Sequence, residues 1–332
     1  MCLYSTGGST GVRDVEMEEF LKIEDLRLFY RTGNNIVKAV NRVSLEIEKA
    51  GQALALIGES GCGKSSLGLA LLRLLPSNVA DFSGKMWLDS QELFSLKNSV
   101  FRQQFRWKKI AWVPQNTKGA LDPRYKIEAQ FGEVFKTHGV KFTKEEMQRL
   151  LWTVGLSPEK GKAIPDRLSG GEIQRACIAL AIALKPALVI LDEPTSALDP
   201  SLKGQIISLL GGLKKEYSSS YVFITHDINQ AGSICEWFAV LYAGQVVEKG
   251  RREDVLRLPL HPYTQKLLDC VDSFASAREP KYISGEPPAL RELPDGCSFA
   301  PRCEKAGPEC KEKAPGLEDK GGGHLAACYK TR

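Results

Sequence analysis

The sequence predicts an α/β fold. We expect a mainly parallel sheet covered by helices, an antiparallel β portion near the N-terminus, an inserted helical subdomain and a small C-terminal extension that contains cysteines. Three observations support this prediction. Apolar runs alternate with helix-like segments from residue 53 onward, strand-like runs crowd 20–57, and four of the nine cysteines fall within 297–328. Strands that alternate with helices are typical of a parallel sheet, because each helix carries the chain back across the sheet.

Composition limits the class of protein. The 332 residues suffice for about two domains, and 43% hydrophobic with 26% charged residues is ordinary for a globular protein. A net charge of +5 is too small to indicate nucleic-acid binding. No apolar run approaches the ~20 residues of a membrane span. Residues 1–19 lack the basic and apolar regions of a signal peptide, so we expect a flexible tail and a protein that stays in the cytoplasm.

The elements follow from the spacing of apolar residues. Alternation or continuous apolar runs predict strands, and a 3.6-residue period predicts helices. The predicted strands include "FLKIEDLRLFY", "VKAVNRVSLEI" and "ALALI" in 20–57, then 187–193, 221–227 and 237–250. The predicted helical stretches are 124–184, 201–215 and the proline-broken "VLRLPLHPYTQKLLDCV" (255–271). Prolines and three consecutive glycines crowd the chain from 280 onward, so this tail needs a staple in place of a large core.

The stretch "GESGCGKSS" (58–66) joins a predicted strand to a predicted helix. Its G-x-x-x-x-G-K-S spacing is typical of a loop whose backbone N–H groups surround a phosphate, at the positive end of a helix. Lys64 would reach the β- and γ-phosphates, and Ser65 would bind Mg²⁺. The sequence therefore predicts a nucleotide site formed by Gly58, Ser60, Gly61, Cys62, Gly63, Lys64, Ser65 and Ser66.

Two further motifs fit a nucleotide site. The apolar strand "ALVILDEP" (187–194) ends in Asp192 and Glu193. An acidic residue at the carboxyl end of a strand beside a phosphate loop can hold Mg²⁺, the role we predict for Asp192. Glu193 is then placed to act as general base toward the attacking water. The segment "DRLSGGEIQR" (166–175) opens a helix, so Ser169, Gly170 and Gly171 offer free backbone N–H groups to a second phosphate contact.

With these motifs the sequence resembles the ATPase subunit of an ABC transporter over about 20–275. The other elements of that family occur in the expected order. They are Gln115 in "WVPQN" (the glutamine loop), "LSGGE" at 168–172 (the signature), "SALD" ending in Asp199 (the D-loop), His226 in "FITHD" (the switch histidine) and Tyr30 (the aromatic on adenine). Phe29 competes with Tyr30 for the adenine role, and Glu172 replaces a common glutamine.

The resemblance implies a P-loop NTPase core at 20–255, with the helical subdomain at about 116–184. It also implies ATP and Mg²⁺ as ligands, with Ser65, Gln115 and Asp192 toward the metal and Glu193, His226 and Gln115 in catalysis. Two ATPase subunits would close head-to-tail, so that Ser169, Gly170 and Gly171 of one cap the γ-phosphate on Lys64 of the other. Asp199 would lie in the same interface.

The C-terminal extension, 256–332, contains "HPYTQKLL" (261–268), which resembles importers of the dipeptide/oligopeptide subfamily. Cys297, Cys303, Cys310 and Cys328 follow. From their spacing, an iron–sulfur cluster, a structural zinc and disulfides stay open, although zinc sites favour paired cysteine knuckles and a reducing cytoplasm disfavours disulfides. The subfamily pattern matched by "CSFAPRC" (297–303) implies a [4Fe–4S] cluster. His324 is an alternative ligand.

The resemblance implies an ATPase that powers peptide import from the cytoplasmic face of the membrane. Its partners would be a second ATPase subunit, expected to be a different homologous chain, two transmembrane permease subunits and an extracytoplasmic substrate-binding protein. Oligosaccharides or nickel complexes are the alternative cargo. A soluble ABC ATPase acting on nucleic acid is the other alternative, but the chain lacks sustained heptads and a basic arm, so we expect no nucleic-acid partner.

Overall fold

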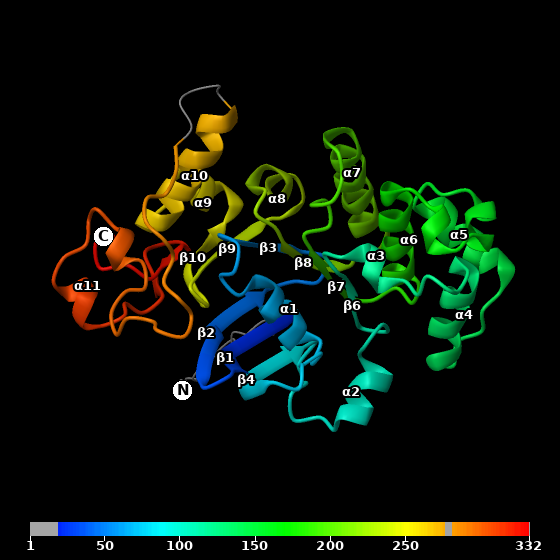
Figure 1. Ribbon diagram of the computed structural model, residues 1–332, viewed down its shortest axis with the longest axis horizontal. Coiled ribbons are helices and arrows are strands. Elements are labelled where there is room, and N and C mark those ends of the chain that lie inside the picture. Colours follow the sequence, from blue (N-terminus) through cyan, green and yellow to red (C-terminus); the bar gives the residue numbers. More distant parts are fainter. Residues whose placement is uncertain (1–18, 276–280, 332) are drawn as a thin grey trace, which may run out of the picture.

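The computed structural model describes residues 19–275 and 281–331 (Figure 1). The predicted tail at 1–19 lies outside this range, except for Glu19. The strands of the described part are β1 (Leu21–Thr32), β2 (Asn35–Ile47), β3 (Ala53–Ile57), β4 (Val79–Leu88), β5 (Gln91–Glu92), β6 (Ile110–Val113), β7 (Leu188–Asp192), β8 (Ser220–Ile224), β9 (Trp237–Tyr242), β10 (Gln245–Arg251), β11 (Glu318–Asp319) and β12 (Leu325–Ala326).

Helices connect most of these strands. They are α1 (Lys64–Leu71), α2 (Asn98–Gln104), α3 (Thr117–Ala120), α4 (Ile127–Thr137), α5 (Lys144–Thr153), α6 (Gly170–Ile182), α7 (Pro200–Tyr217), α8 (Ile228–Ile234), α9 (Arg252–Arg257), α10 (Pro262–Ala275) and α11 (Glu309–Glu312). Short 3-10 turns occupy Pro158–Lys162, Pro165–Arg167 and Ala300–Arg302. No helix of the described residues is long and apolar enough to cross a bilayer.

The N-terminal strands form an antiparallel sheet in the order β2-β1-β4-β5. β1 and β2 are the two arms of a hairpin in which Thr32 pairs with Asn35. Gly33 makes this tight turn with a φ of 58°, a conformation that glycine adopts without strain. The strands that the alternating N-terminal pattern predicted, and the antiparallel β portion that the family resemblance implied, are therefore confirmed.

The central sheet has the order β11-β12-β10-β9-β3-β8-β7-β6, and its strands from β9 to β6 are parallel. β3 lies in the middle and is fully buried. Because side chains alternate along a strand, Ala53, Ala55 and Ile57 enter one hydrophobic core while Leu54 and Leu56 enter another. Because both faces of β3 are buried, every residue of this strand has to be apolar, which explains the sequence "ALALI".

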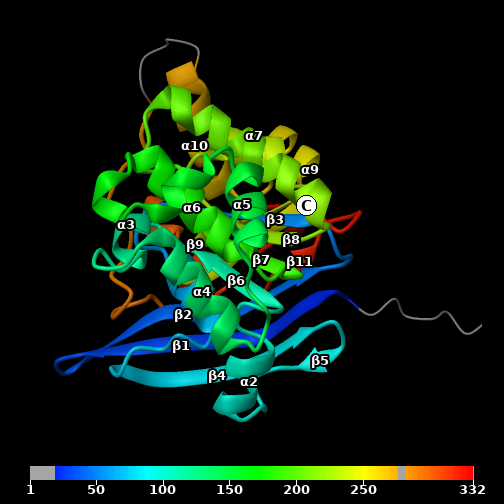
Figure 2. The same ribbon diagram turned by 90° about the vertical axis from the view of Figure 1, so that its right-hand side faces the viewer.

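The two cores separate three layers. In Figure 1, α7, α8, α9 and α10 lie on one side of the central sheet, and α1 with the antiparallel sheet lies on the other. Figure 2 shows the same order after a quarter turn, with the helices above and β1, β2, β4 and β5 below. The predicted helical subdomain contains α3, α4, α5 and α6, which stand together at one end of the molecule.

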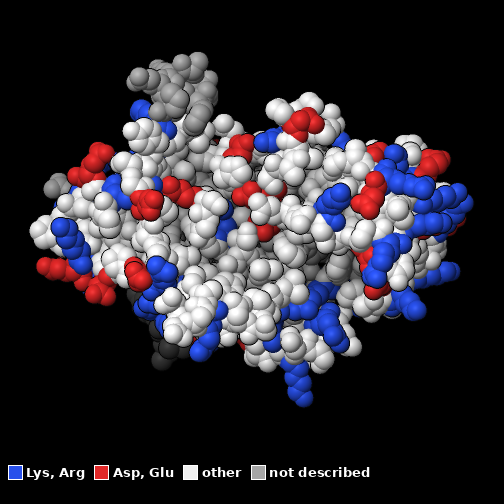
Figure 3. All heavy atoms as spheres, in the orientation of Figure 1, with Lys and Arg blue, Asp and Glu red and all other residues white. Residues whose placement is uncertain are grey.

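Positive charge gathers at this same end. Figure 3 shows Lys and Arg side chains concentrated where Figure 1 places α4 and α5, with a second group near α2, whereas both signs are mixed toward the C-terminal extension. Lys126, Lys136 and Lys144 are exposed members of this group. The small net charge of +5 is therefore unevenly distributed over the surface.

The C-terminal residues return to the central sheet. Leu325 and Ala326 of β12 pair with Lys249 and Glu248 of β10, and the N–H of Ala327 donates to the carbonyl of Val247 at 2.8 Å. The buried imidazole of His324 lies 2.8 Å from the fully buried carboxylate of Glu248. The tail that the sequence left without a core of its own therefore docks on the core of the preceding domain.

Candidate active site

The phosphate loop lies between β3 and α1, as its spacing predicts. Gly58 has a φ of 153°, and a Cβ there would lie 2.3 Å from the carbonyl oxygen of Leu241. Gly63 has a φ of 107°, and its Cβ would lie 2.0 Å from the carbonyl oxygen of Ala39. Both positions need glycine because other parts of the backbone approach too closely for a side chain. The two glycines thus fix the shape of the loop.

Lys64 lies inside this loop and is only 6% exposed. Its ammonium donates to the carbonyl oxygens of Gly58 at 2.8 Å and Glu59 at 2.9 Å. The sulfur of Cys62, 3.7 Å from the Lys64 Nζ, closes the same space. Burial raises the pKa of the Cys62 thiol, with the Lys64 charge opposing the shift. A positive charge is thus held among backbone groups at the start of α1, where a phosphate would add the missing anion.

Ser65 and Asp192 meet beside the loop. The Ser65 hydroxyl donates to Asp192 Oδ1 at 3.0 Å. Asp192, the last residue of β7, is 3% exposed, and burial raises its pKa against the opposing hydrogen bond from Ser65. One hydroxyl and one carboxylate oxygen, the ligand types that Mg²⁺ prefers, therefore face each other at the edge of the sheet.

Glu193, Gln115 and His226 come together although they are far apart in the sequence. Gln115 Nε2 donates to Glu193 Oε2 at 3.2 Å, and His226 Nδ1 lies 3.2 Å from Glu193 Oε1. Glu193 has a φ of 45°, and its N–H donates to Ile224 of β8 at 2.8 Å. A non-glycine residue held in this strained region is typical of functional sites. The three predicted catalytic side chains therefore form one hydrogen-bonded group.

The signature segment caps α6. The Ser169 hydroxyl accepts from the N–H of Glu172, and the Glu172 carboxylate accepts from the N–H of Ser169, which makes a capping box. The ion pair with Lys160 lowers the pKa of Glu172. The glutamate that replaces the usual glutamine therefore supports this helix start. Ser169 and Gly170 are exposed, while Gly171 is buried.

The remaining predicted residues occupy separate places. Tyr30 is half-buried in β1 and packs on the core beneath the antiparallel sheet. Asp199 is exposed and caps α7, where Oδ1 accepts from the N–H groups of Ser201 at 3.1 Å and Leu202 at 3.0 Å. Within the phosphate loop, Ser60 and Gly61 are exposed and Ser66 is half-buried.

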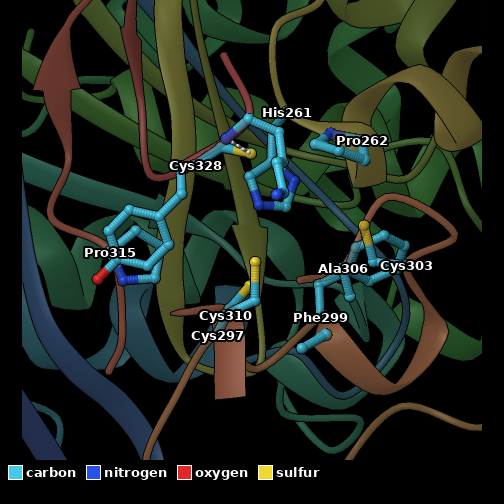
Figure 4. Close-up of a pocket in the computed structure, with 12 residues that line it drawn as sticks. His261, Pro262, Cys297, Phe299, Cys303, Ala306, Cys310, Pro315 and Cys328 are labelled. Carbon is cyan, nitrogen blue, oxygen red and sulfur yellow. Dashed lines mark hydrogen bonds between the residues drawn. The ribbon is translucent and has the colours of Figure 1, made fainter. Parts of the chain in front are cut away.

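The four C-terminal cysteines line one cavity together with His261 (Figure 4). None of them forms a disulfide. Burial raises the thiol pKa of Cys297 and of Cys303. The cavity is small, about 10 Å³, and no three His, Cys, Asp or Glu residues of the described chain are placed to hold a metal ion. The structure thus gathers the four cysteines around one small cavity but does not place them to hold a single metal ion.

Two residues outside the predicted site contact the phosphate loop. Tyr263, in the "HPYTQKLL" segment, accepts a hydrogen bond at its hydroxyl from the N–H of Glu59 at 2.9 Å. Arg302, in "CSFAPRC", forms an ion pair with the Glu59 carboxylate at 2.7 Å. From the sequence, "HPYTQKLL" and "CSFAPRC" indicated only a subfamily. Their contacts with the phosphate loop could not be predicted, because local spacing does not show which distant loop a segment contacts.

Two family models match the chain. The one described as "ABC transporter" matches residues 40–196, and "Oligopeptide/dipeptide transporter, C-terminal region" matches residues 247–310. Among known relatives, the dipeptide transport ATP-binding protein DppD of Caldanaerobacter subterraneus subsp. tengcongensis is 38% identical, covering 90% of this chain and 93% of its own. The oligopeptide transport ATP-binding protein OppD of Salmonella typhimurium is 37% identical, covering 93% of each chain.

A solved structure agrees with the fold. The dimeric post-hydrolysis state of the ATP-binding cassette MJ0796, bound to ADP and Pi, superposes with a TM-score of 0.62 at 28% identity, covering 70% of this chain and 98% of that one. The phosphate loop, the Ser65–Asp192 pair and the group around Glu193 thus occur on a matching fold. The chain therefore belongs to the family of ATP-binding, ATP-hydrolysing proteins of dipeptide and oligopeptide ABC transporters.

Proposed function

We propose that this chain hydrolyses ATP to drive the import of dipeptides or oligopeptides through a membrane permease. The observation that carries the proposal is the Glu193 group. The Glu193 carboxylate accepts a hydrogen bond from Gln115 at 3.2 Å and lies 3.2 Å from the His226 ring. Asp192, the residue before it, accepts a hydrogen bond from Ser65 of the phosphate loop. A candidate base and a candidate metal ligand are thus consecutive residues next to a phosphate site.

The nucleotide would be held by the loop and by Tyr30. Lys64 and the backbone N–H groups of 58–66 would bind the β- and γ-phosphates, in place of the carbonyl contacts that Lys64 makes in this structure. Ser65, Asp192 and Gln115 would hold Mg²⁺, which supplies charge neutralisation of the phosphates when bound. The Tyr30 ring would stack on the adenine.

Glu193 would act as the general base. Its carboxylate accepts the proton of the attacking water, while Gln115 and His226 orient the carboxylate and the water. The signature, Ser169 with Gly170 and Gly171, would approach the γ-phosphate from a second ATPase subunit in a head-to-tail dimer, with Asp199 at the interface. The exposure of Ser169 and Gly170 at the start of α6 supports this assignment, because the first N–H groups of a helix have no carbonyl partner within the helix.

The family implies the remaining subunits. We propose two transmembrane permease subunits, a second ATPase chain homologous to this one, and an extracytoplasmic binding protein that selects the cargo. In this assembly the chain would lie on the cytoplasmic face of the membrane. Residues 20–255 would be the nucleotide-binding domain, with its helical subdomain at about 116–184, and 256–332 the extension. The relatives named for dipeptide and oligopeptide transport favour peptides as cargo.

The test of catalysis compares wild type with Glu193→Gln, and uses Glu216→Gln as the matched control because Glu216 is exposed on α7. We expect Glu193→Gln to lower ATP turnover by about 10²- to 10⁴-fold, the usual contribution of a general base. ATP binding should be retained. Turnover at the wild-type rate in Glu193→Gln would refute the assignment of the base, and loss in Glu216→Gln would indicate a nonspecific effect.

The test of transport uses the assembled transporter. Affinity purification from detergent-solubilised membranes should recover two integral membrane subunits and a second ATPase chain, and the cognate binding protein should bind labelled peptides. Binding of oligosaccharides or nickel complexes in their place would refute peptide cargo. Recovery with ribosomes or nucleic acid would refute the importer assignment.

We propose that Cys297, Cys303, Cys310 and Cys328 hold a [4Fe–4S] cluster. Such a cluster takes one cysteine for each iron, so its ligands surround a core and do not meet on a single ion. Four cysteines around one cavity, with no disulfide among them, suit that ligand set. Anaerobic purification should give about four irons and four sulfides per chain, lost in Cys303→Ser and kept in Cys235→Ala. One zinc, or no metal, would refute the cluster.

A further inference from the structure

Arg302 belongs to the cysteine-containing extension, yet its guanidinium lies against the phosphate loop. Nη1 donates to Glu59 Oε2 at 2.7 Å, and Nη2 donates to Glu59 Oε1 at 3.1 Å. The two residues are 243 positions apart in the sequence. The side chains of Arg302 and Glu59 are 3% and 27% exposed. A bidentate pair with this degree of burial is held in one geometry and is poorly screened by salt.

The guanidinium has no N–H group left over. Besides the two bonds to Glu59, Nε donates to the carbonyl of Ser284 at 3.1 Å, Nη2 to that of Ile283 at 3.1 Å and Nη1 to the Tyr242 hydroxyl at 3.2 Å. These bonds use all five donors of an arginine, and lysine has only three. An arginine guanidinium is always protonated in proteins, so Arg302 brings a permanent positive charge to the Glu59 carboxylate. The arrangement is thus specific to arginine.

The same loop residue is held from a second side. The N–H of Glu59 donates to the Tyr263 hydroxyl at 2.9 Å, and the Glu59 carbonyl accepts from Lys64 Nζ at 2.9 Å. The rings of Tyr242, Tyr263 and Phe299 pack with centroids 4.6 to 5.4 Å apart beneath these contacts. Glu59 therefore connects the lysine that would bind phosphate with two segments of the extension.

Glu59 places a negative charge in a loop that would bind the negatively charged phosphates of a nucleotide. An unpaired carboxylate would repel the polyphosphate of a nucleotide bound one residue away, and the repulsion would be strong because the loop is partly desolvated. The fork of Arg302 cancels this charge and keeps the carboxylate turned toward the extension.

We propose that Arg302 is a positioning residue for ATP binding. It pairs with the Glu59 carboxylate, neutralises its charge and keeps it away from the phosphates that the loop would bind. The inference rests on the proposed function, because it concerns the same ATP site. It predicts that the defect left by removing Arg302 is caused by the unpaired carboxylate of Glu59. Removing that carboxylate as well should then restore binding.

The test measures the dissociation constant of Mg²⁺-ATP for the full chain by isothermal titration calorimetry. Arg302→Met should weaken binding at least tenfold, and Arg302→Lys should give a smaller loss. Glu59→Gln alone should stay within threefold of wild type, and the Arg302→Met/Glu59→Gln double variant should return to within threefold. Lys320→Met is the matched control, because it removes an ion pair of the same extension, with Glu318 at 3.0 Å, that does not involve the loop.

The outcomes distinguish charge pairing with Glu59 from a purely structural role of Arg302. A purely structural role would weaken binding in Arg302→Met without rescue by Glu59→Gln, and this result would overturn the proposal. Wild-type affinity in Arg302→Met would also overturn it. Should Arg302→Met fail to fold, Arg302→Gln, which also removes the charge but keeps a polar side chain, carries the same test, since its loss must be reversed by Glu59→Gln. A wild-type chain that does not bind ATP would refute the proposed function itself, which separates the two failures.

Discussion

Because β2 lies close to the phosphate loop, we expect alanine substitutions at two glycines of this loop to differ in their effect on stability. Gly63 has a φ of 107°, and a Cβ there would lie 2.0 Å from the carbonyl oxygen of buried Ala39. Gly61 has a φ of 78°, but a Cβ there meets no atom within 4 Å. The two positions thus share backbone strain and differ in available space.

The magnitudes follow from these two terms. A left-handed conformation costs an L-residue about 1–2 kcal/mol, and forcing an extra carbon into a packed region costs about 1–3 kcal/mol more. Gly61→Ala should therefore lower the free energy of unfolding by about 1–2 kcal/mol. Gly63→Ala should lower it by about 2–5 kcal/mol, because both terms apply.

Urea-induced unfolding without nucleotide measures this difference, since bound ATP would add its own stabilisation. Gly33→Ala, in the β1–β2 turn with a φ of 58° and open space, controls for strain away from the loop. The reasoning would be refuted if Gly63→Ala and Gly61→Ala lost equal stability.

Three further predictions rest on single side chains. Phe299→Ala should lower the free energy of unfolding by about 3–5 kcal/mol by thermal or urea denaturation, because the ring is 1% exposed among other aromatic rings; a loss under 1 kcal/mol would contradict the packing. Burial raises the pKa of Cys177 to about 12, so the unfolded thiol ionises first. Stability should then fall as pH rises above about 9, and Cys177→Ala should remove up to about 1.4 kcal/mol per pH unit of that fall; identical pH profiles would contradict it. Ser169→Ala should cost about 1 kcal/mol of stability through the lost capping box and also reduce ATP turnover, which the equally conservative Ser233→Ala should not.

Local patterns were enough to predict the ATP site but not its surroundings. The spacing of Gly58, Gly63, Lys64 and Ser65 implies a loop shape, and the strand before Asp192 ends at the same sheet edge because parallel strands share their direction. The catalytic roles of Gln115 and His226 came from the family resemblance, and their contacts with the Glu193 carboxylate are seen only in three dimensions.

The contacts of the extension could not be predicted from one sequence. Arg302 lies next to a cysteine and reads as a solvated loop residue, and Glu59 reads as an arbitrary residue between the fixed positions of a motif. The pairing of Arg302 with Glu59 depends on the return of the chain to β10. A strand as short as β12 has too few residues to be predicted from a sequence pattern. Burial of a charge pair depends on tertiary packing, and local spacing carries no information about it.

The docking of β12 on β10 has a consequence for the newly made chain. Until β12 arrives, β10 is an open sheet edge, whose unpaired backbone groups can pair with another chain. Leu325 follows Arg251 by 74 residues, so at about 5–20 residues per second of synthesis the edge waits roughly 4–15 s for its cover. β11 then adds the exposed acidic residues Glu318 and Asp319 as the outermost strand. Charge at that rim keeps the finished sheet from growing by recruiting strands of neighbouring molecules.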